Sequence, residues 1–208
     1  MYIIQEGVNA VNTKYTKPFH DLGPLKITPQ SGTYRDLAAW TGIALDSPPC
    51  QDVGFNTPRF PIYINSYNTT AQKKAYDLYA SATSGTDSPY YNSIFMFEDY
   101  ATAGVRARDV SASAFGFRQD LMLAAPLIIY GPANKTGDDA VAQLGNKLRD
   151  ILHEGTGSSE LHTYLNYAYG NEGPESWYGY EQSRQDHLKA LKKKYDPKGK
   201  FSFYGPIA

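Results

Sequence analysis

The pattern of apolar and polar positions predicts short strands interleaved with amphipathic helices. Apolar residues recur every three or four positions in 69–83 and 134–153, which predicts two helices that each bury one side. Apolar and polar residues alternate in 60–67 and 160–169, which predicts two strands. The other expected elements are strands at 1–11, 92–99, 113–118 and about 121–130 and helices at 33–43, 102–110 and about 174–195.

The helix at 134–153 has the clearest pattern. Thr136 and Asp139 resemble a capping box at its start, and Gly155 and Gly157 are expected to end it. Its expected core stripe consists of Val141, Leu144, Leu148, Ile151 and Leu152. The helix at 69–83 is expected to be capped by Thr69 or Thr70 in the same way, and Pro174 is expected to open the last helix, with a core stripe from Trp177 to Tyr195.

Two strands carry further detail. The strand at 92–99 is apolar on both faces up to Glu98, which predicts a central place in a sheet. The strand at about 121–130 contains Pro126, where a bulge is expected. Segments 17–29 and 46–61 are rich in proline and glycine, and loops are expected there, with at most one short strand in the first.

The alternation in 160–169 divides that segment into two faces. Leu161, Thr163, Leu165 and Tyr167 would share one face, and His162, Tyr164, Asn166 and Ala168 would share the other. The leucines are expected to pack beneath the helix at 134–153. The polar side chains would then be free to meet a ligand or solvent.

The order of elements predicts the fold class. Strands alternate with helices that are apolar on one side only, so we expect an α+β fold with a largely antiparallel sheet and helices packed on one face. No repeat, low-complexity tract or linker divides the chain. A single domain over 1–208 is therefore expected.

Composition and charge exclude several classes of function. Hydrophobic residues make up 41% and charged residues 20%, which is typical of a soluble globular protein. The net charge of −1 provides no basic field for nucleic acid or an anionic membrane surface, and no apolar stretch is long enough to span a membrane. The N-terminus has no signal-peptide pattern, so a cytoplasmic location is the default expectation.

Aromatic residues are the unusual part of the composition. The 18 tyrosines either fill strand positions or line a pocket for flat, partly polar ligands. A single cysteine, Cys50, allows no intrachain disulfide and is expected to be a small buried apolar residue. The four histidines are scattered, so no metal site is expected. Asn68 and Asn134 each begin a glycosylation sequon.

The C-terminal quarter resembles a known family. The motifs that carry the resemblance are Tyr164-Leu165-Asn166-Tyr167, Tyr178-Gly179, Leu188-Lys189, Tyr195-Asp196-Pro197 and the ending Phe201…Pro206-Ile207. They are similar to the C-terminal signature of FAD-linked oxidases of the berberine-bridge-enzyme type, which include fungal secondary-metabolite oxidases and 6-hydroxynicotine oxidase. Weaker similarity extends upstream, so the whole chain resembles this family's substrate domain, incomplete at its N-terminus.

The departures from the family pattern concern the cofactor. The family's flavin domain holds FAD through a glycine-rich loop and often a covalent histidine, and this chain has no such loop after a strand. Gly205 also stands where glutamine is common. The resemblance thus implies FAD as the family's cofactor, but we expect this chain alone to be colourless, because side chains supply no two-electron acceptor.

Six residues are candidates for the site, mainly through the resemblance. Tyr164 and Glu98 are the candidate catalytic residues, since a carboxylate beside aromatic rings can act as a general acid. Tyr164, Asn166, His162 and Arg118 are candidates for substrate binding. Asn166 and Tyr167 are candidates for contact with flavin if a flavin domain is supplied. For each, a structural role remains open: a solvated strand end, an exposed polar face or a local arginine pair.

Three hypotheses of function follow. The first is the substrate-binding half of an FAD-linked oxidoreductase for small aromatic, polyketide or alkaloid-like molecules, working with a separate flavin-domain chain or surviving as a remnant. The second is a flavin-independent isomerase or cyclase that uses the aromatic pocket and a proton from Glu98 or a tyrosine. The third is a non-catalytic binding domain that pairs or self-associates through an exposed sheet face.

Overall fold

A computed structural model describes residues 1–47, 51 and 54–207. Its contacts divide the chain into two compact units, Met1–Val53 and Gly54–Ala208. Cys50, for which burial was expected, lies outside the described residues. The expectation of one domain over 1–208 stays a prediction.

The first unit is helical where it has regular structure. Its helices are α1 (Thr13–His20), η1 (Tyr34–Asp36) and α2 (Leu37–Trp40). The expected strand at 1–11 is wrong, because Tyr2 and Ile4 are exposed and no strand pairs with them in the described part of the unit. Part of the expected loop at 17–29 belongs instead to α1, which starts where the Asn12 side chain accepts a hydrogen bond from the Lys14 amide at 2.9 Å.

The second unit contains a three-stranded antiparallel sheet. Its strands are β1 (Ile62–Ile64), β2 (Ile94–Glu98) and β3 (Met122–Leu127), in the order β1-β3-β2. The expectation that the strand at 92–99 would be central is therefore wrong. The central strand is β3, whose residues are nearly all buried, whereas Ile94 and Phe97 of β2 are 43% and 45% exposed.

The bulge expected at Pro126 is also absent. Pro126 pairs with Phe95 in an unbroken register, and its carbonyl accepts a hydrogen bond from the Phe60 amide at 3.0 Å. The strand expected at 113–118 does not form. Residues 113–118 contain no helix or strand, and they follow the short helix α4 (Ala103–Arg106) and η3 (Val110–Ala112).

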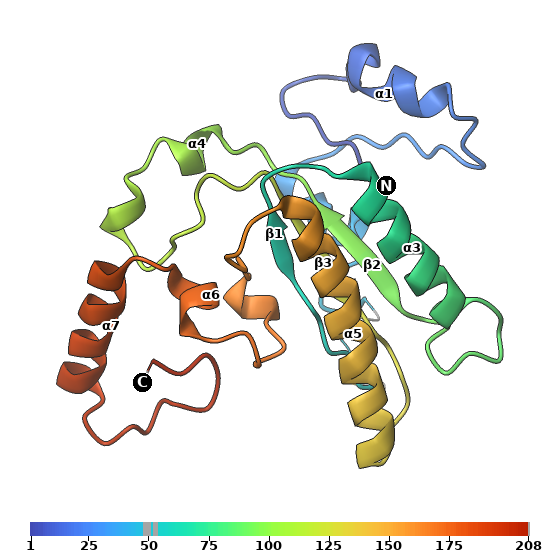
Figure 1. Ribbon diagram of the computed structural model, residues 1–208. Helices are drawn as coiled ribbons and strands as arrows, with labels where there is room; N and C mark the ends of the chain where they lie inside the picture. The colour runs from blue at the N-terminus through green and yellow to red at the C-terminus, as the bar shows by residue number, and fades with distance from the viewer. Residues whose placement is uncertain (48–50, 52–53, 208) are drawn as a thin grey trace. The chain divides into compact units, whose positions relative to one another are not determined.

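Two long helices cover one face of the sheet (Figure 1). They are α3 (Thr69–Thr83) and α5 (Lys135–Thr156). The expected stripe of α5 is confirmed: Val141, Leu148 and Leu152 are buried, and Leu144 and Ile151 pack against the same core. From the sheet, the core takes Phe60, Ile62, Ile64, Ala124 and Ile128.

The helix caps correct the sequence analysis. Asn68 caps α3 by accepting hydrogen bonds from the Thr70 and Ala71 amides, and Asn134 caps α5 by accepting one from the Gly137 amide. Both are preferred over the threonines because an asparagine oxygen reaches the free amides of the first turn. The two sequon asparagines thus have a structural role. Gly157, not Gly155, ends α5, with φ of +70°.

The C-terminal region departs most from expectation. The strand expected at 160–169 is wrong: 165–167 form a single 3-10 turn, η4 (Leu165–Tyr167). The single helix expected at 174–195 is two helices, α6 (Pro174–Tyr178) and α7 (Gln182–Tyr195), separated at Gly179 with φ of +109°. Trp177 is buried as expected, but Tyr195 is 70% exposed. Within the described ranges, no helix has both the length and the apolar character needed to cross a bilayer.

Candidate functional site

A cluster of tyrosines surrounds one carboxylate on the sheet face opposite α3 and α5. Because side chains alternate along strands, the register Tyr63↔Leu123↔Glu98 puts these three residues on the face that the helices do not cover. We call Tyr63, Glu98, Tyr100, Tyr164 and Tyr167 the tyrosine cluster.

Glu98 is the only carboxylate of the cluster and ends β2. The Tyr100 hydroxyl donates a hydrogen bond to Glu98 Oε2 at 2.7 Å. Partial desolvation raises the pKa of Tyr100 although the residue is 69% exposed, and the hydrogen bond and charge of Glu98 raise it further. Burial likewise raises the pKa of Tyr167 to about 12, with the charge and hydrogen bond of Glu98 adding to the effect and Arg59 opposing it. Glu98 therefore accepts a hydrogen bond from Tyr100 and favours the neutral form of both neighbouring phenols.

Tyr63 lies at the base of the cluster. Its ring centroid is 6.1 Å from that of Tyr164 and 6.2 Å from that of Phe117. Burial raises the pKa of Tyr63, and nearby negative groups including Asp120 and Glu98 act in the same direction. Removal from water and the nearby negative groups thus both favour the neutral form of the Tyr63 phenol.

The η4 turn brings Tyr164 and Tyr167 together. Their rings are 5.0 Å apart in an edge-to-face arrangement, and Asn166 Nδ2 donates a hydrogen bond to the Tyr164 hydroxyl at 2.7 Å. The expected separation of Tyr167 from Tyr164 on opposite faces is wrong, because a turn of three residues, unlike a strand, aligns residues three apart. Ala168, expected on the polar face, is buried for the same reason.

His162 lies beside the cluster but is held by structural partners. Its Nδ1 is 2.9 Å from Asp120 Oδ2, and its ring stacks on Phe117 at 4.2 Å. Burial by itself lowers the pKa of His162, but the hydrogen bonds and charges of Asp120 and Glu160 outweigh this and raise the pKa above its ordinary value of 6.5. Its backbone carbonyl accepts a hydrogen bond from the Tyr63 amide at 2.8 Å, which aligns this segment with β1.

Arg118 is not brought to the cluster directly. Its guanidinium donates hydrogen bonds to Ser113 Oγ at 2.7 Å and to the Val105 carbonyl at 3.4 Å, and it lies over the Phe115 ring. These contacts fit the structural alternative considered for Arg118, in which it pairs locally with a backbone carbonyl.

A buried ionic network anchors the segment that carries Tyr164 and Tyr167. The Glu172 carboxylate is fully buried and pairs with Arg149 of α5. It also accepts hydrogen bonds from the Tyr169 and Gly170 amides, each at 2.9 Å, and from Trp177 Nε1 at 3.2 Å. Because every oxygen of the carboxylate is used, this network fixes the path of the chain after η4.

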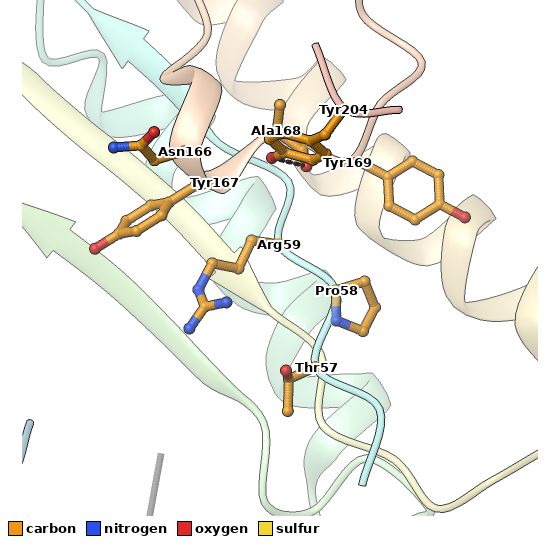
Figure 2. Close-up of a pocket in the computed structure, with 8 residues that line it drawn as sticks. All are labelled: Thr57, Pro58, Arg59, Asn166, Tyr167, Ala168, Tyr169 and Tyr204. Atoms are coloured by element: carbon orange, nitrogen blue, oxygen red, sulfur yellow. Dashed lines mark hydrogen bonds between the residues drawn. The ribbon is translucent and has the colours of Figure 1, made fainter. Parts of the chain in front are cut away.

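A cavity of about 240 Å³ opens next to the cluster. Figure 2 shows its lining, in which Arg59 extends toward Tyr167 and Asn166 lies beyond it. The Arg59 guanidinium carbon is 5.2 Å from the centroid of the Tyr167 ring. The remaining lining residues are Thr57, Pro58, Ala168, Tyr169 and Tyr204.

Three residues of the site were missed by the sequence analysis: Arg59, Tyr63 and Tyr100. Strand alternation indicates the positions of Arg59 and Tyr63. Odd-numbered residues before and within β1 share the face opposite Ile62 and Ile64, and both residues are odd-numbered. Tyr100 follows Glu98 by two residues and continues the face of β2. Tyr167 was named through the family resemblance, but alternation does not place it in the cluster, because its position depends on the 3-10 turn.

The residues of the site fit the planar ring system of a flavin but not the pyrophosphate of FAD. The flat aromatic rings and the Asn166 amide are suited to a planar heterocycle. In the described part of the second unit, none of the loops after β1, β2 and β3 contains more than one glycine, so none is a glycine-rich cradle for a pyrophosphate. The described residues also contain no group of three or more side chains that could hold a metal ion.

Two curated proteins similar in sequence to this chain share one description, FAD-linked oxidoreductase. No protein-family model matches the chain. The FAD-linked oxidoreductase chyH of Penicillium rubens is 55% identical over 206 residues, which are 99% of this chain and 41% of the relative. The FAD-linked oxidoreductase chry5 of Gibberella zeae is 47% identical over 206 residues, which are 99% of this chain and 40% of the relative.

Solved structures show the same fold at low sequence identity. Wild-type BBE-like 1 of Physcomitrella patens matches 97% of this chain and 43% of its own with a TM-score of 0.69 at 16% identity. A variant of berberine bridge enzyme matches 95% of this chain and 44% of its own with a TM-score of 0.68 at 11% identity. The α+β fold with an antiparallel sheet is thereby confirmed. The chain is thus similar over nearly its whole length to FAD-linked oxidoreductases, has the fold of berberine-bridge-enzyme-like proteins, and spans about two fifths of the length of the relatives it matches.

Proposed function

We propose that this chain forms the substrate-binding wall of an FAD-linked oxidoreductase of secondary metabolism, in which Glu98 is the base that removes a proton from a small aromatic substrate. The observation that carries the proposal is the position of Glu98. Its carboxylate lies on the sheet face that α3 and α5 do not cover, accepts a hydrogen bond from Tyr100 and is next to Tyr167. The flavin would be held by a portion equivalent to the part of the relatives that this chain does not match. That portion would be on the same polypeptide or on a separate one.

The proposal assigns proton transfer to the chain's own residues. When bound, the flavin supplies the two-electron acceptor that side chains lack. Glu98 would accept the proton that leaves the substrate, within reach of a hydrogen bond or one bridging water. Tyr100 and Tyr167 would stabilise the carboxylate by donating to it, and their raised pKa values keep both phenols protonated at neutral pH.

Tyr164 and Asn166 would position the ring of the substrate. The hydrogen bond from Asn166 fixes the Tyr164 hydroxyl, and the edge-to-face contact with Tyr167 fixes the ring. Such fixed aromatic walls hold a flat molecule in one orientation, which is the contribution that a binding wall makes to a rate.

Reconstitution with a flavin-binding portion tests the proposal. The chain is co-expressed with the part of the Penicillium rubens relative that it does not match, as two polypeptides and as one fused chain. We expect co-purification and a flavin fluorescence that is quenched relative to the flavin-binding portion alone, because closely packed tyrosines quench flavins by electron transfer. Replacing Tyr164 and Tyr167 together by phenylalanine should restore part of the fluorescence.

The result also separates the rival functions. If neither arrangement forms a complex, or if flavin fluorescence is the same with and without this chain, the proposal is wrong. Proton transfer without flavin, as in an isomerase, would then be the use of Glu98 that remains.

A further inference from the structure

Arg59 is held rigidly on the same sheet face as the tyrosine cluster. Its backbone bridges Leu127 of β3, and flanking hydrogen bonds join the Phe60 amide to the Pro126 carbonyl at 3.0 Å and the Ile128 amide to the Pro58 carbonyl at 3.1 Å. Phe60 is fully buried in the helix-covered core. Because neighbouring side chains alternate, Arg59 projects to the opposite side.

The guanidinium of Arg59 lacks a polar partner. It is half-buried, and its Nε is buried without a hydrogen bond; within the described ranges it forms no ion pair. The Nε atoms of Arg118 and Arg149 are also buried without a hydrogen bond, so the difference lies in the terminal nitrogens. Those of Arg149 pair with Glu172, and those of Arg184 pair with Glu181 and donate to the Val110 carbonyl. A guanidinium removed from water is costly without an acceptor, so its present contact with the Tyr167 ring compensates only in part.

The cavity around Arg59 contains positive charge and aromatic surface but no acid. Of its eight described lining residues, none is Asp or Glu, and three are tyrosines. The hydroxyl of Tyr204 is already used, since it donates to the Leu165 and Ala168 carbonyls. Asn166 Nδ2 already donates to the Tyr164 hydroxyl, so the groups left for a ligand are the guanidinium, the second N–H of that amide and the faces of the aromatic rings (Figure 2).

We propose that Arg59 forms an anion subsite for a small aromatic molecule bearing a carboxylate. The planar guanidinium is suited to two parallel hydrogen bonds with a carboxylate, and the cavity of about 240 Å³ has room for one substituted ring. Tyr167 lies between Arg59 and Glu98, so the acidic end of the ligand would be held one ring away from the base. The last step rests on the proposed function, whereas the subsite itself does not.

Benzoate is the probe for the subsite, and benzamide is its neutral counterpart of nearly equal shape. Each is titrated into the chain alone and followed by calorimetry and by NMR. We expect benzoate to bind and benzamide to bind about tenfold more weakly or worse, because a hydrogen bond to a charged group contributes more than a neutral one. Equal binding of the two, or no binding of either, would overturn the proposal.

Variants locate the binding. Arg59→Met keeps the aliphatic stem and removes the charge, and it should weaken benzoate binding about tenfold or more without affecting benzamide. Arg108→Met, at an exposed arginine of the same unit, should bind benzoate as the wild type does. If Arg59→Met does not fold, Arg59→Lys keeps the charge but loses the paired geometry and should retain only part of the affinity. Unchanged affinity in Arg59→Met, or in Arg59→Lys where that variant replaces it, contradicts the proposal.

Inorganic phosphate distinguishes the source of the anion. If phosphate binds as tightly as benzoate and displaces it, the subsite serves a phosphate group such as that of a cofactor, and the aromatic acid is wrong. We expect phosphate to compete weakly, because it leaves the aromatic lining unused. All these titrations omit the flavin-binding portion, so their failure can be told apart from failure of the reconstitution.

Discussion

The two faces of the three-stranded sheet differ in what their side chains do. On the face under α3 and α5, Ile62, Ile64 and Ala124 are buried by at least 97% and belong to the hydrophobic core. On the opposite face, Tyr63 and Glu98 carry polar groups into a cluster of phenols. In β1, the even positions Ile62 and Ile64 thus contribute to stability and the odd position Tyr63 to the candidate site. Substitutions on the helix-covered face should mainly lower stability, and those on the opposite face should mainly lower activity.

The largest expected effect is on catalysis at the tyrosine cluster. In the reconstituted complex, Glu98→Gln should lower the rate at which a small aromatic substrate reduces the flavin by roughly 10²–10⁴-fold, the usual contribution of a positioned base. Stopped-flow absorbance measures this rate. The melting temperature should stay close to that of the wild type, since Glu98 is only partly buried. A variant that melts early and reduces flavin normally would reverse the roles of the two faces.

The next effect is on stability at the helix-covered face. Leu148 is fully buried at the centre of α5, so Leu148→Ala should reduce the free energy of unfolding by about 2–5 kcal/mol. Chemical denaturation measures it, with Tyr164→Phe as the matched control at a partly buried position. Leu165, which the sequence places in the core, is only half-buried and should lose less on truncation. Similar losses for Leu148→Ala and Tyr164→Phe would remove the distinction between the faces.

A glycine of α5 gives a smaller test of the same face. A Cβ at Gly145 would lie 2.0 Å from the buried Phe60 ring, so Gly145→Ala should destabilise by about 1–3 kcal/mol despite the better helix propensity of alanine. Gly104 of α4 has open space at the same point. Gly104→Ala should therefore stabilise by about 0.5–1 kcal/mol, and thermal melts of both variants should shift in opposite directions.

His162 provides the smallest effect, through pH. Its pKa is raised in the folded chain, so folding favours the protonated form. The contribution to stability is complete below the ordinary value of 6.5 and is lost as pH rises through the folded-state pKa. The difference in unfolding free energy between wild type and His162→Asn should shrink across that window. A difference that grows with pH would show that Asp120 does not hold the protonated imidazole.

The sequence predicts the helix-covered face better than the tyrosine cluster, for a physical reason. The stripe Val141, Leu148 and Leu152 follows from local periodicity, since a 22-residue helix repeats the same geometry throughout. Tyr164 and Tyr167 meet in a 3-10 turn where alternation indicates a strand, and the chain just after this turn is held by Glu172, which pairs with the distant Arg149 of α5. Thr163 and Ala168 are both buried, but the Thr163 amide donates to the Ser176 carbonyl of α6 and the Ala168 amide to the Leu165 carbonyl, so neither is paired in the sheet.

Hydrogen exchange of the reconstituted complex tests the central claim most directly. That claim is that the tyrosine cluster, and not the helix-covered face, meets the flavin-binding portion. Backbone amides are compared in the chain alone and in complex with the unmatched part of the Penicillium rubens relative. We expect slower exchange at 98–100 and 164–169 and unchanged exchange in α3 and α5. Protection confined to α3 and α5, with no change at 98–100 and 164–169, would contradict the account.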